Sequence, residues 1–186
     1  MILPRAKALE FLRIHIKNER MIAHSLSSEA VMRALALRLG EDEGKWGLAG
    51  LLHDVDTEIT YADPLTHALV GAQMLTEMGI DADIVDAIRM HNEYATGLER
   101  RTVFQHALAA GETITGLITA TAMVYPDRKV ASVKSKSVTK RMKEKAFAAS
   151  VSRESIMECE KIGLSLDEFA ALSIAAMASI ADQIGL

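Results

Sequence analysis

The stretch of sequence that decides the fold is WGLAGLLHD, residues 46–54. It is apolar or glycine until it reaches two polar residues, His53 and Asp54. Together with the residues before it, the stretch predicts a buried helix over about residues 41–53. Such a helix delivers His53 and Asp54 to the interior or to a cleft of the protein.

Outward from this stretch, hydrophobic residues recur at helical spacing along almost the whole chain. Aromatic residues make up only 4%, and no hairpin dipeptide separates alternating segments. The pattern therefore predicts an all-α protein. Helices are expected over residues 4–17, 21–39, 41–53, 63–78, 81–91, 102–124 (as one helix or two) and 137–146, then one capped by Ser152 and a last one opened by the capping box of Ser165 and Glu168.

Length and composition narrow the class of protein. A chain of 186 residues with 49% hydrophobic and 25% charged residues is typical of one globular domain, over residues 1–186. Cys159 is the only cysteine, which excludes a disulfide scaffold and leaves any metal to histidines and carboxylates. No run approaches the roughly 18 apolar residues of a membrane span, and no signal-peptide core is present. We therefore expect a cytoplasmic protein with no membrane partner.

Charge is distributed unevenly along the chain. The net charge is −4, yet residues 128–145 contain eight bases and one acid, a local charge of +7. This basic segment is interpreted either as a surface that attracts phosphates or as a solvated helix face. Because the rest of the chain is acidic, a small phosphorylated ligand fits better than a nucleic acid.

Four of the six histidines fall beside expected helix ends, close to acidic residues: His24, His53, His67 and His91. Short connections favour antiparallel helices, which can gather such ends on one side of a bundle. Imidazole and carboxylate groups together suit a first-row divalent cation. His15 and His106 have no such accompanying residues and are interpreted as structural histidines.

Asp54 strengthens the case for a cation. An ionised aspartate buried at the end of an apolar helix costs several kcal/mol unless it is paired or binds a cation. A basic side chain from elsewhere in the chain would also serve, so the sequence leaves both explanations open.

The order of His24, His53-Asp54 and a later acid in an Ala-rich helix resembles the HD superfamily of metal-dependent phosphohydrolases. AHSLSSEAVMRALA (23–36) resembles the segment with the family's first histidine, and THALVGAQML (66–75) and AIRMHNE (87–93) resemble the histidine segments of members with more than one metal. TGLITATAMVYP and VKSKSVTKRMKEKAFAASVSRESI are similar to a bacterial and archaeal branch described only as predicted hydrolases. The resemblance implies an HD-domain-like helical bundle, with a metal-site core over about residues 20–125 and a basic segment with C-terminal helices over 128–186.

The resemblance also implies a site. One divalent ion, Mn, Fe, Zn, Co or Ni, is expected on His24, His53, Asp54 and Glu112, and Asp54 bridges to a second ion on His67 and His91. The expected catalytic residues are His53, Asp54 and Asp56. Asp56 is expected to orient a ligand histidine or to accept a proton, unless it and Glu58 are simply solvated.

Two positions depart from the family pattern. Glu112 stands where the family's last metal ligand is an aspartate, so its longer side chain changes affinity or geometry. Asn92 stands where some two-metal members have a second consecutive histidine. Since a neutral amide is a poor ligand, the second site is expected to be weaker or empty.

The predicted activity is hydrolysis of a phosphomonoester or phosphodiester by a metal-activated water. The candidate phosphate ligands are Lys134, Lys136, Lys140 and Arg141, with Arg20 and Arg89 as weaker candidates. Aromatic residues are too scattered to distinguish a nucleotide from another phosphate ester. No Walker, Rossmann or GxSxG motif is present. The alternatives are a regulatory module that binds metal or nucleotide without turnover, and a nucleic-acid-associated protein that uses the basic segment.

Overall fold

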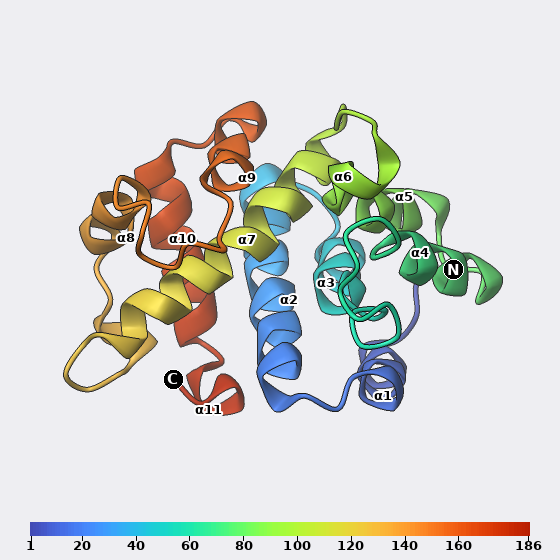
Figure 1. Ribbon diagram of the computed structural model, residues 1–186, viewed down its shortest axis with the longest axis horizontal. Helices are drawn as coiled ribbons and strands as arrows, with labels where there is room; N and C mark the ends of the chain where they lie inside the picture. Colours follow the sequence, from blue (N-terminus) through green and yellow to red (C-terminus); the bar gives the residue numbers. More distant parts are fainter.

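The computed structural model describes all residues, 1–186, as helices and connecting turns with no strand (Figure 1). This confirms the predicted all-α class. The elements are α1 (Arg5–His15), α2 (Glu19–Leu39), α3 (Glu43–Leu52), α4 (Leu69–Glu77), α5 (Ala82–His91), α6 (Glu93–Thr96), α7 (Val103–Met123), η1 (Val130–Ser132), α8 (Ser135–Met142), α9 (Arg153–Met157), η2 (Glu158–Ile162), α10 (Leu166–Ala178) and α11 (Ala181–Ile184).

The two longest helices, α2 and α7, form the centre of the molecule and pack against each other. In Figure 1, α1 and α3 to α6 lie on one side of this pair, and α8, α10 and α11 lie on the other. Buried hydrophobic residues form one cluster that extends along the chain from Ala8 to Met177. No helix combines the length and the apolar character that a membrane span needs.

Close approach of helices explains two glycines. At Gly50 of α3, an added Cβ would lie 2.6 Å from the carbonyl oxygen of Ser28, so α3 packs directly on the backbone of α2. At Gly111 of α7, an added Cβ would lie 3.0 Å from the sulfur of Met32. Of the two possibilities for residues 102–124, the structure has one helix, α7, and Gly111 lets it lie close to Met32 of α2.

Side-chain caps set several helix starts. The Asp42 side chain accepts a hydrogen bond from the Lys45 amide and begins α3. The predicted capping box at Ser165 is confirmed at the start of α10. A second capping box, formed by Thr102 and Gln105, opens α7 and was not expected from the sequence.

The predicted helix over residues 63–78 is wrong over its first six residues. Turns continue from His53 to Ala68, and α4 begins only at Leu69. The cause is Ala68, whose φ of 75° lies outside the helical region. His67 therefore lies in the turn before α4 rather than inside the helix.

The helix predicted over residues 137–146 is also displaced, because α8 spans Ser135–Met142. Arg153 explains the early end: its guanidinium donates to the carbonyl oxygens of Arg141, Glu144, Phe147, Ala148 and Val151. These bonds fix a compact turn after α8. α8 itself packs against α7 and α10.

Candidate metal centre

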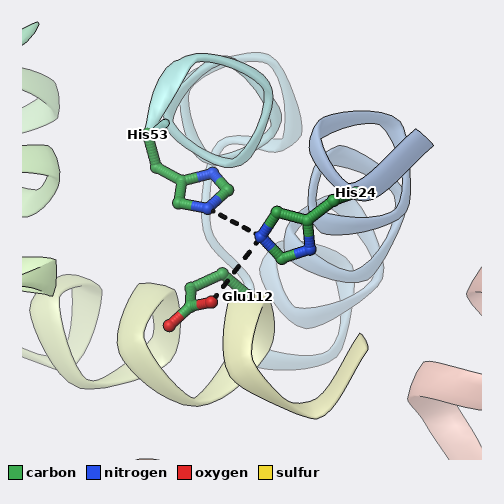
Figure 2. A group of neighbouring side chains, drawn as sticks. All are labelled: His24, His53 and Glu112. Carbon is green, nitrogen blue, oxygen red and sulfur yellow. Dashed lines mark hydrogen bonds and ion pairs between the residues drawn. The ribbon is translucent and has the colours of Figure 1, made fainter. Parts of the chain in front are cut away.

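Six side chains from five parts of the chain meet between α2, α3, α5 and α7. We call them the inner cluster: His24 of α2, His53 and Asp54 after α3, His67 before α4, His91 at the end of α5, and Glu112 of α7. Figure 2 shows three of them, His24, His53 and Glu112, pointing toward one another from three helices. The structure thus brings together all the residues that the sequence proposed as metal ligands.

One half of the inner cluster is built around His24. Its Nε2 lies 3.1 Å from Nε2 of His53, 3.4 Å from Oδ2 of Asp54 and 3.8 Å from Oε2 of Glu112. His24, His53 and Glu112 offer ligand atoms that all lie within 4.8 Å of one another, close enough to share one ion. The longer side chain of Glu112, compared with the family's aspartate, therefore still places its carboxylate within the cluster.

Asp54 connects this half to the other. Its Oδ2 lies 3.3 Å from Nε2 of His53, while its Oδ1 lies 3.1 Å from Nε2 of His67 and 3.6 Å from Nε2 of His91. The Nε2 atoms of His67 and His91 are 3.1 Å apart. A carboxylate with one oxygen toward each pair of imidazoles has the arrangement of a bridging ligand.

Backbone carbonyl groups fix two of the imidazoles. Nδ1 of His53 lies 2.9 Å from the carbonyl oxygen of Gly50, and Nδ1 of His91 lies 2.6 Å from that of Ile88. A carbonyl oxygen can only accept, so we assign the hydrogen of each ring to Nδ1. Each ring then turns its Nε2 toward the cluster.

Side chains fix the other two imidazoles in the same sense. Oδ1 of Asp56 accepts from Nδ1 of His67 at 2.8 Å. The Thr115 hydroxyl donates to the Glu112 carbonyl oxygen at 2.7 Å, so it accepts from Nδ1 of His24 at 3.0 Å. All four rings therefore turn Nε2 toward the cluster, the orientation of histidines that bind a metal through Nε2.

This donor set fits a divalent cation. Two pairs of Nε2 atoms face each other at 3.1 Å with a carboxylate between the pairs. Lone pairs in such contact repel one another unless a proton or a cation lies between them. Imidazole and carboxylate ligands suit first-row divalent ions.

The charge balance of the cluster points the same way. Burial opposes ionisation of Asp54, yet the facing imidazoles, that of His53 foremost, hold its pKa well below the usual range. Burial also lowers the pKa of His67, but hydrogen bonds to Asp54 and Asp56 outweigh it and raise that pKa to about 10. Asp54 is therefore a buried anion that needs positive charge beside it, either from a bound cation or from protonated imidazoles.

Asp56 is fully buried and uses both carboxylate oxygens within the fold. Oδ1 accepts from His67, and Oδ2 accepts from the backbone amides of Ala68 at 2.9 Å and Gly71 at 2.7 Å. Of the two roles expected for Asp56, this geometry favours orientation of His67. The same bonds hold the start of α4, which explains the conformation of Ala68.

Arg100 holds the end of α5 and was not foreseen. Its guanidinium donates to the carbonyl oxygens of Met90 at 2.8 Å and His91 at 2.6 Å, and pairs with Glu158 at 2.5 Å. Glu158 in turn accepts from Nδ1 of His106 at 2.7 Å. His106 is therefore a satisfied structural histidine, as expected, and nothing in the polar sequence around Arg100 indicated its role.

Asn92 and Glu58 also support the backbone around the cluster. The Asn92 amide donates to the carbonyl oxygens of Pro64 and His67 at 3.0 and 2.9 Å, which ties the turn before α4 to α5. Glu58 accepts from the amides of Lys17 and Asn18, just before α2. Glu58 is therefore engaged with the backbone rather than merely solvated.

The proposed phosphate ligands lie apart from the inner cluster, on or beside α8. Arg141 stacks on Phe147, with 3.9 Å from its guanidinium carbon to the ring centroid, and pairs with Glu144 at 3.4 Å. Lys140 lies 3.9 Å from the same carboxylate. Lys134 and Lys136 make no side-chain ion pair within the chain, so they are the freer cations of this group.

Comparison with known proteins adds a family match. The family described as HD domain matches residues 21–123, more than half of the chain and all of the inner cluster. Ribonuclease Y of Nitratidesulfovibrio vulgaris is 36% identical over 76 residues, which are 41% of this chain and 15% of that protein. Ribonuclease Y 1 of Pediococcus pentosaceus is 28% identical over 96 residues, 52% of this chain and 18% of that protein. The chain thus spans less than a fifth of these relatives, and no solved structure matches it.

Proposed function

Because the chain belongs to the HD-domain family, we propose that it is a metal-dependent phosphohydrolase that cleaves a small phosphate ester. The observation that carries the proposal is the orientation of the four imidazoles. Their Nδ1 atoms are all engaged outside the cluster, and their Nε2 atoms all face Asp54 or Glu112. Four imidazoles that turn Nε2 toward two carboxylates have the orientation of metal ligands, which supports the proposal.

In this proposal His24, His53, Asp54 and Glu112 hold one divalent ion, and Asp54, His67 and His91 hold a second. A bound divalent ion supplies a Lewis acid that neutralises charge on phosphoryl oxygens and lowers the pKa of water toward neutrality. The ligand types admit Mn, Fe, Zn, Co and Ni. Asn92 is bonded to backbone carbonyls, so it adds no ligand to the second site.

The other polar residues prepare the site. Thr115 and Asp56 hold His24 and His67 in the tautomer that leaves Nε2 free, and the Gly50 and Ile88 carbonyls do the same for their neighbours. Lys134, Lys136, Lys140 and Arg141 are proposed to attract the phosphate, since they form the most basic part of the chain. His53, Asp54 and Asp56 stay the proposed catalytic group, with Asp56 acting through His67.

The first test is metal content and turnover. Protein purified without chelators is expected to contain up to about two metal equivalents by elemental analysis, falling toward one in His67→Ala. Hydrolysis of phosphate mono- and diesters should depend on that metal, stop with a chelator, and be lost in Asp54→Asn. The matched control is Asp167→Asn, an exposed aspartate on α10. Absence of metal after incubation with manganese, iron and zinc salts contradicts the proposal.

A second candidate function is cleavage of RNA phosphodiesters. The matched relatives are named ribonucleases, and this observation alone favours RNA as a substrate. A short single-stranded RNA belongs in the substrate panel, with binding measured as a function of salt. Cleavage of the RNA but not of small esters would replace the small-molecule substrate by RNA.

The alternative is a regulatory module that binds metal or a nucleotide without turnover. Glu112 in place of the family's aspartate is the feature that supports it. Metal binding with no hydrolysis of any substrate class, in a protein that still binds phosphate esters, would favour this module over the enzyme.

A further inference from the structure

One of the proposed metal ligands lies at the very end of a helix. His91 is the last residue of α5, and its ring is bonded to the carbonyl oxygen of Ile88, one turn earlier in the same helix. The last carbonyl groups of a helix have no partner inside it, and helix ends fray. The position of the His91 ring therefore depends on what holds this last turn.

A single guanidinium group holds the last turn of α5. Nε and Nη2 of Arg100 donate to the carbonyl oxygens of Met90 and His91 at 2.8 and 2.6 Å. The planar group thus reaches two successive carbonyl groups, and its positive charge lies at the negative end of the helix dipole. Arg100 therefore caps α5 at His91 itself.

Arg100 is held in turn by a carboxylate from a distant part of the chain. Glu158 of η2 accepts from Nη1 of Arg100 at 2.5 Å, and only 4% of the Arg100 side chain and 11% of the Glu158 side chain are exposed. The other oxygen of Glu158 accepts from Nδ1 of His106, on α7, at 2.7 Å. Glu93 also pairs with Arg100, at 3.1 Å, but its side chain is 41% exposed. The pair with Glu158 is therefore the one that water screens least.

The rest of the inner cluster does not depend on these contacts. The bonds that fix the other three imidazoles involve neither Arg100 nor Glu158. Of the two proposed ions, only the second uses His91. A change at Arg100 or Glu158 should therefore affect the two ions unequally.

We propose that Arg100 and Glu158 are positioning residues for the second metal ion, the one assigned to Asp54, His67 and His91. The inference rests on the proposed function. It adds to the metal centre a part of the chain outside the family match, because Glu158 lies beyond residue 123. Through this ion pair, the C-terminal part of the chain determines whether the centre holds one ion or two.

The test is a titration of the metal-free full chain with Co²⁺, followed by visible absorption, with the bound metal counted by elemental analysis. The unaltered protein is expected to bind two ions in two steps, and His67→Ala identifies the step that belongs to the second ion. Arg100→Lys keeps the positive charge but loses the planar group that reaches two carbonyl oxygens. It should weaken the second step about tenfold or more, as removal of a group that orients a metal ligand does, and leave the first step unchanged.

Glu158→Gln is a second variant with nearly the same shape as the original residue. It should weaken the same step, because the amide lacks the charge that holds Arg100, and it carries the test should Arg100→Lys fail to fold. The matched control is Arg101→Lys, the same substitution at the exposed neighbouring arginine. Ser165→Ala breaks the capping box of α10, so it lowers stability elsewhere and should leave both steps unchanged. Circular dichroism checks that each protein is folded during the titration.

A purely structural role of the ion pair gives a different result. The variants would then melt at lower temperature, but the folded protein would keep both steps or weaken both alike. Either pattern overturns the inference, as does an unaltered protein that binds fewer than two ions. Because the titration does not measure hydrolysis, the two proposals fail separately. Loss of the second step in a protein without hydrolysis removes the phosphohydrolase and keeps the positioning role, whereas hydrolysis with both steps unchanged in the variants does the reverse.

Discussion

At the residue scale, Asp56 shows how one carboxylate serves both the site and the fold. One oxygen fixes the His67 ring, and the other accepts two amides at the start of α4. Any replacement must therefore satisfy three donors at once. Only an ionised carboxylate does so, since an amide offers one acceptor atom and brings two hydrogens of its own.

We predict that Asp56→Asn weakens metal binding about 10- to 100-fold, the usual cost of losing a partner that orients a metal-binding histidine. The new amide hydrogens would face N–H donors and repel them, so the His67 ring would lose its orientation toward the cluster. Metal titration followed by elemental analysis measures the effect. Glu58→Gln is the matched control, because Glu58 also accepts two backbone amides but does not touch the inner cluster. Equal metal affinity in both variants would contradict the orienting role.

Cys159 gives a second prediction at this scale. Burial raises the pKa of its thiol from 9.0 to about 11, so the neutral thiol is favoured by the folded state. Alkylation by iodoacetamide should be slow in the native protein at pH 8 and complete after unfolding in urea. The stability that this group contributes is present below about pH 9 and is lost as the pH rises toward about 11. Rapid alkylation of native protein would show that the thiol is reached without unfolding.

The histidines and Asp54 of the inner cluster could be proposed from the sequence because they lie near helix ends, whereas Glu112, in the middle of α7, came only from the resemblance to the family. Asp56 was expected to orient a ligand histidine, but the other residues that hold the cluster were not foreseen. Thr115, Asn92 and Arg100 act through partners that are distant along the chain, such as His24 for Thr115. Only tertiary packing reveals these partners, and no local pattern marks them.

At the element scale, the contact between α2 and α3 sets the position of His24 relative to His53. The absence of a side chain at Gly50 lets the two helices meet backbone to backbone. This contact explains why an apolar helix ending in His-Asp contains glycine, a poor helix former.

We predict that Gly50→Ala destabilises the protein by about 1–3 kcal/mol, because the added methyl group would meet a backbone oxygen that has no free path to move. Urea unfolding monitored by circular dichroism measures the change. Gly47→Ala is the comparison in the same helix, since the atoms nearest to its methyl group would belong to the side chain of Arg33 and not to the backbone. Equal effects of the two substitutions would rule out the backbone contact as the cause.

Arg100 links α5 to η2 through buried charges, and we predict that Arg100→Met costs about 3–5 kcal/mol of stability, because Glu158 is then left buried without its strongest partner. Urea unfolding gives this value. The control is Arg101→Met, its exposed neighbour, which should stay within about 0.5 kcal/mol of the unaltered protein. A small effect of Arg100→Met would contradict this cost and would mean that the contact with His106 is enough to hold Glu158.

The helices with strong apolar periodicity, such as α2 and α7, were predicted within two residues at each end. The start of α4 was not, because its sequence is compatible with a helix from Asp63 onward. That helix is excluded because the Ala68 amide donates to Asp56, a contact that holds Ala68 at a positive φ. In the segment that contains His67, tertiary contacts of the site therefore override the local helix propensity.

At the scale of the whole molecule, metal binding should appear as stability. A ligand present at about 1,000 times its dissociation constant stabilises a folded protein by about 4 kcal/mol. For a domain of this size each kcal/mol corresponds to about 2–4 °C, so saturating Mn²⁺ is expected to raise the melting temperature by about 8–16 °C over protein with a chelator. Scanning calorimetry measures the shift, and Asp54→Asn should abolish it. An equal shift in Asp54→Asn would place the ion elsewhere.

The inner cluster draws its six residues from a span that begins at His24 and ends at Glu112. In an unfolded chain only His53 and Asp54 are neighbours, and the others come together only when long loops have closed. We therefore expect an ion to bind this cluster after folding and to add contacts that the transition state lacks. Divalent cations should consequently leave the refolding rate unchanged and slow unfolding. The metal-bound protein would then stay folded longer because its barrier to unfolding is higher.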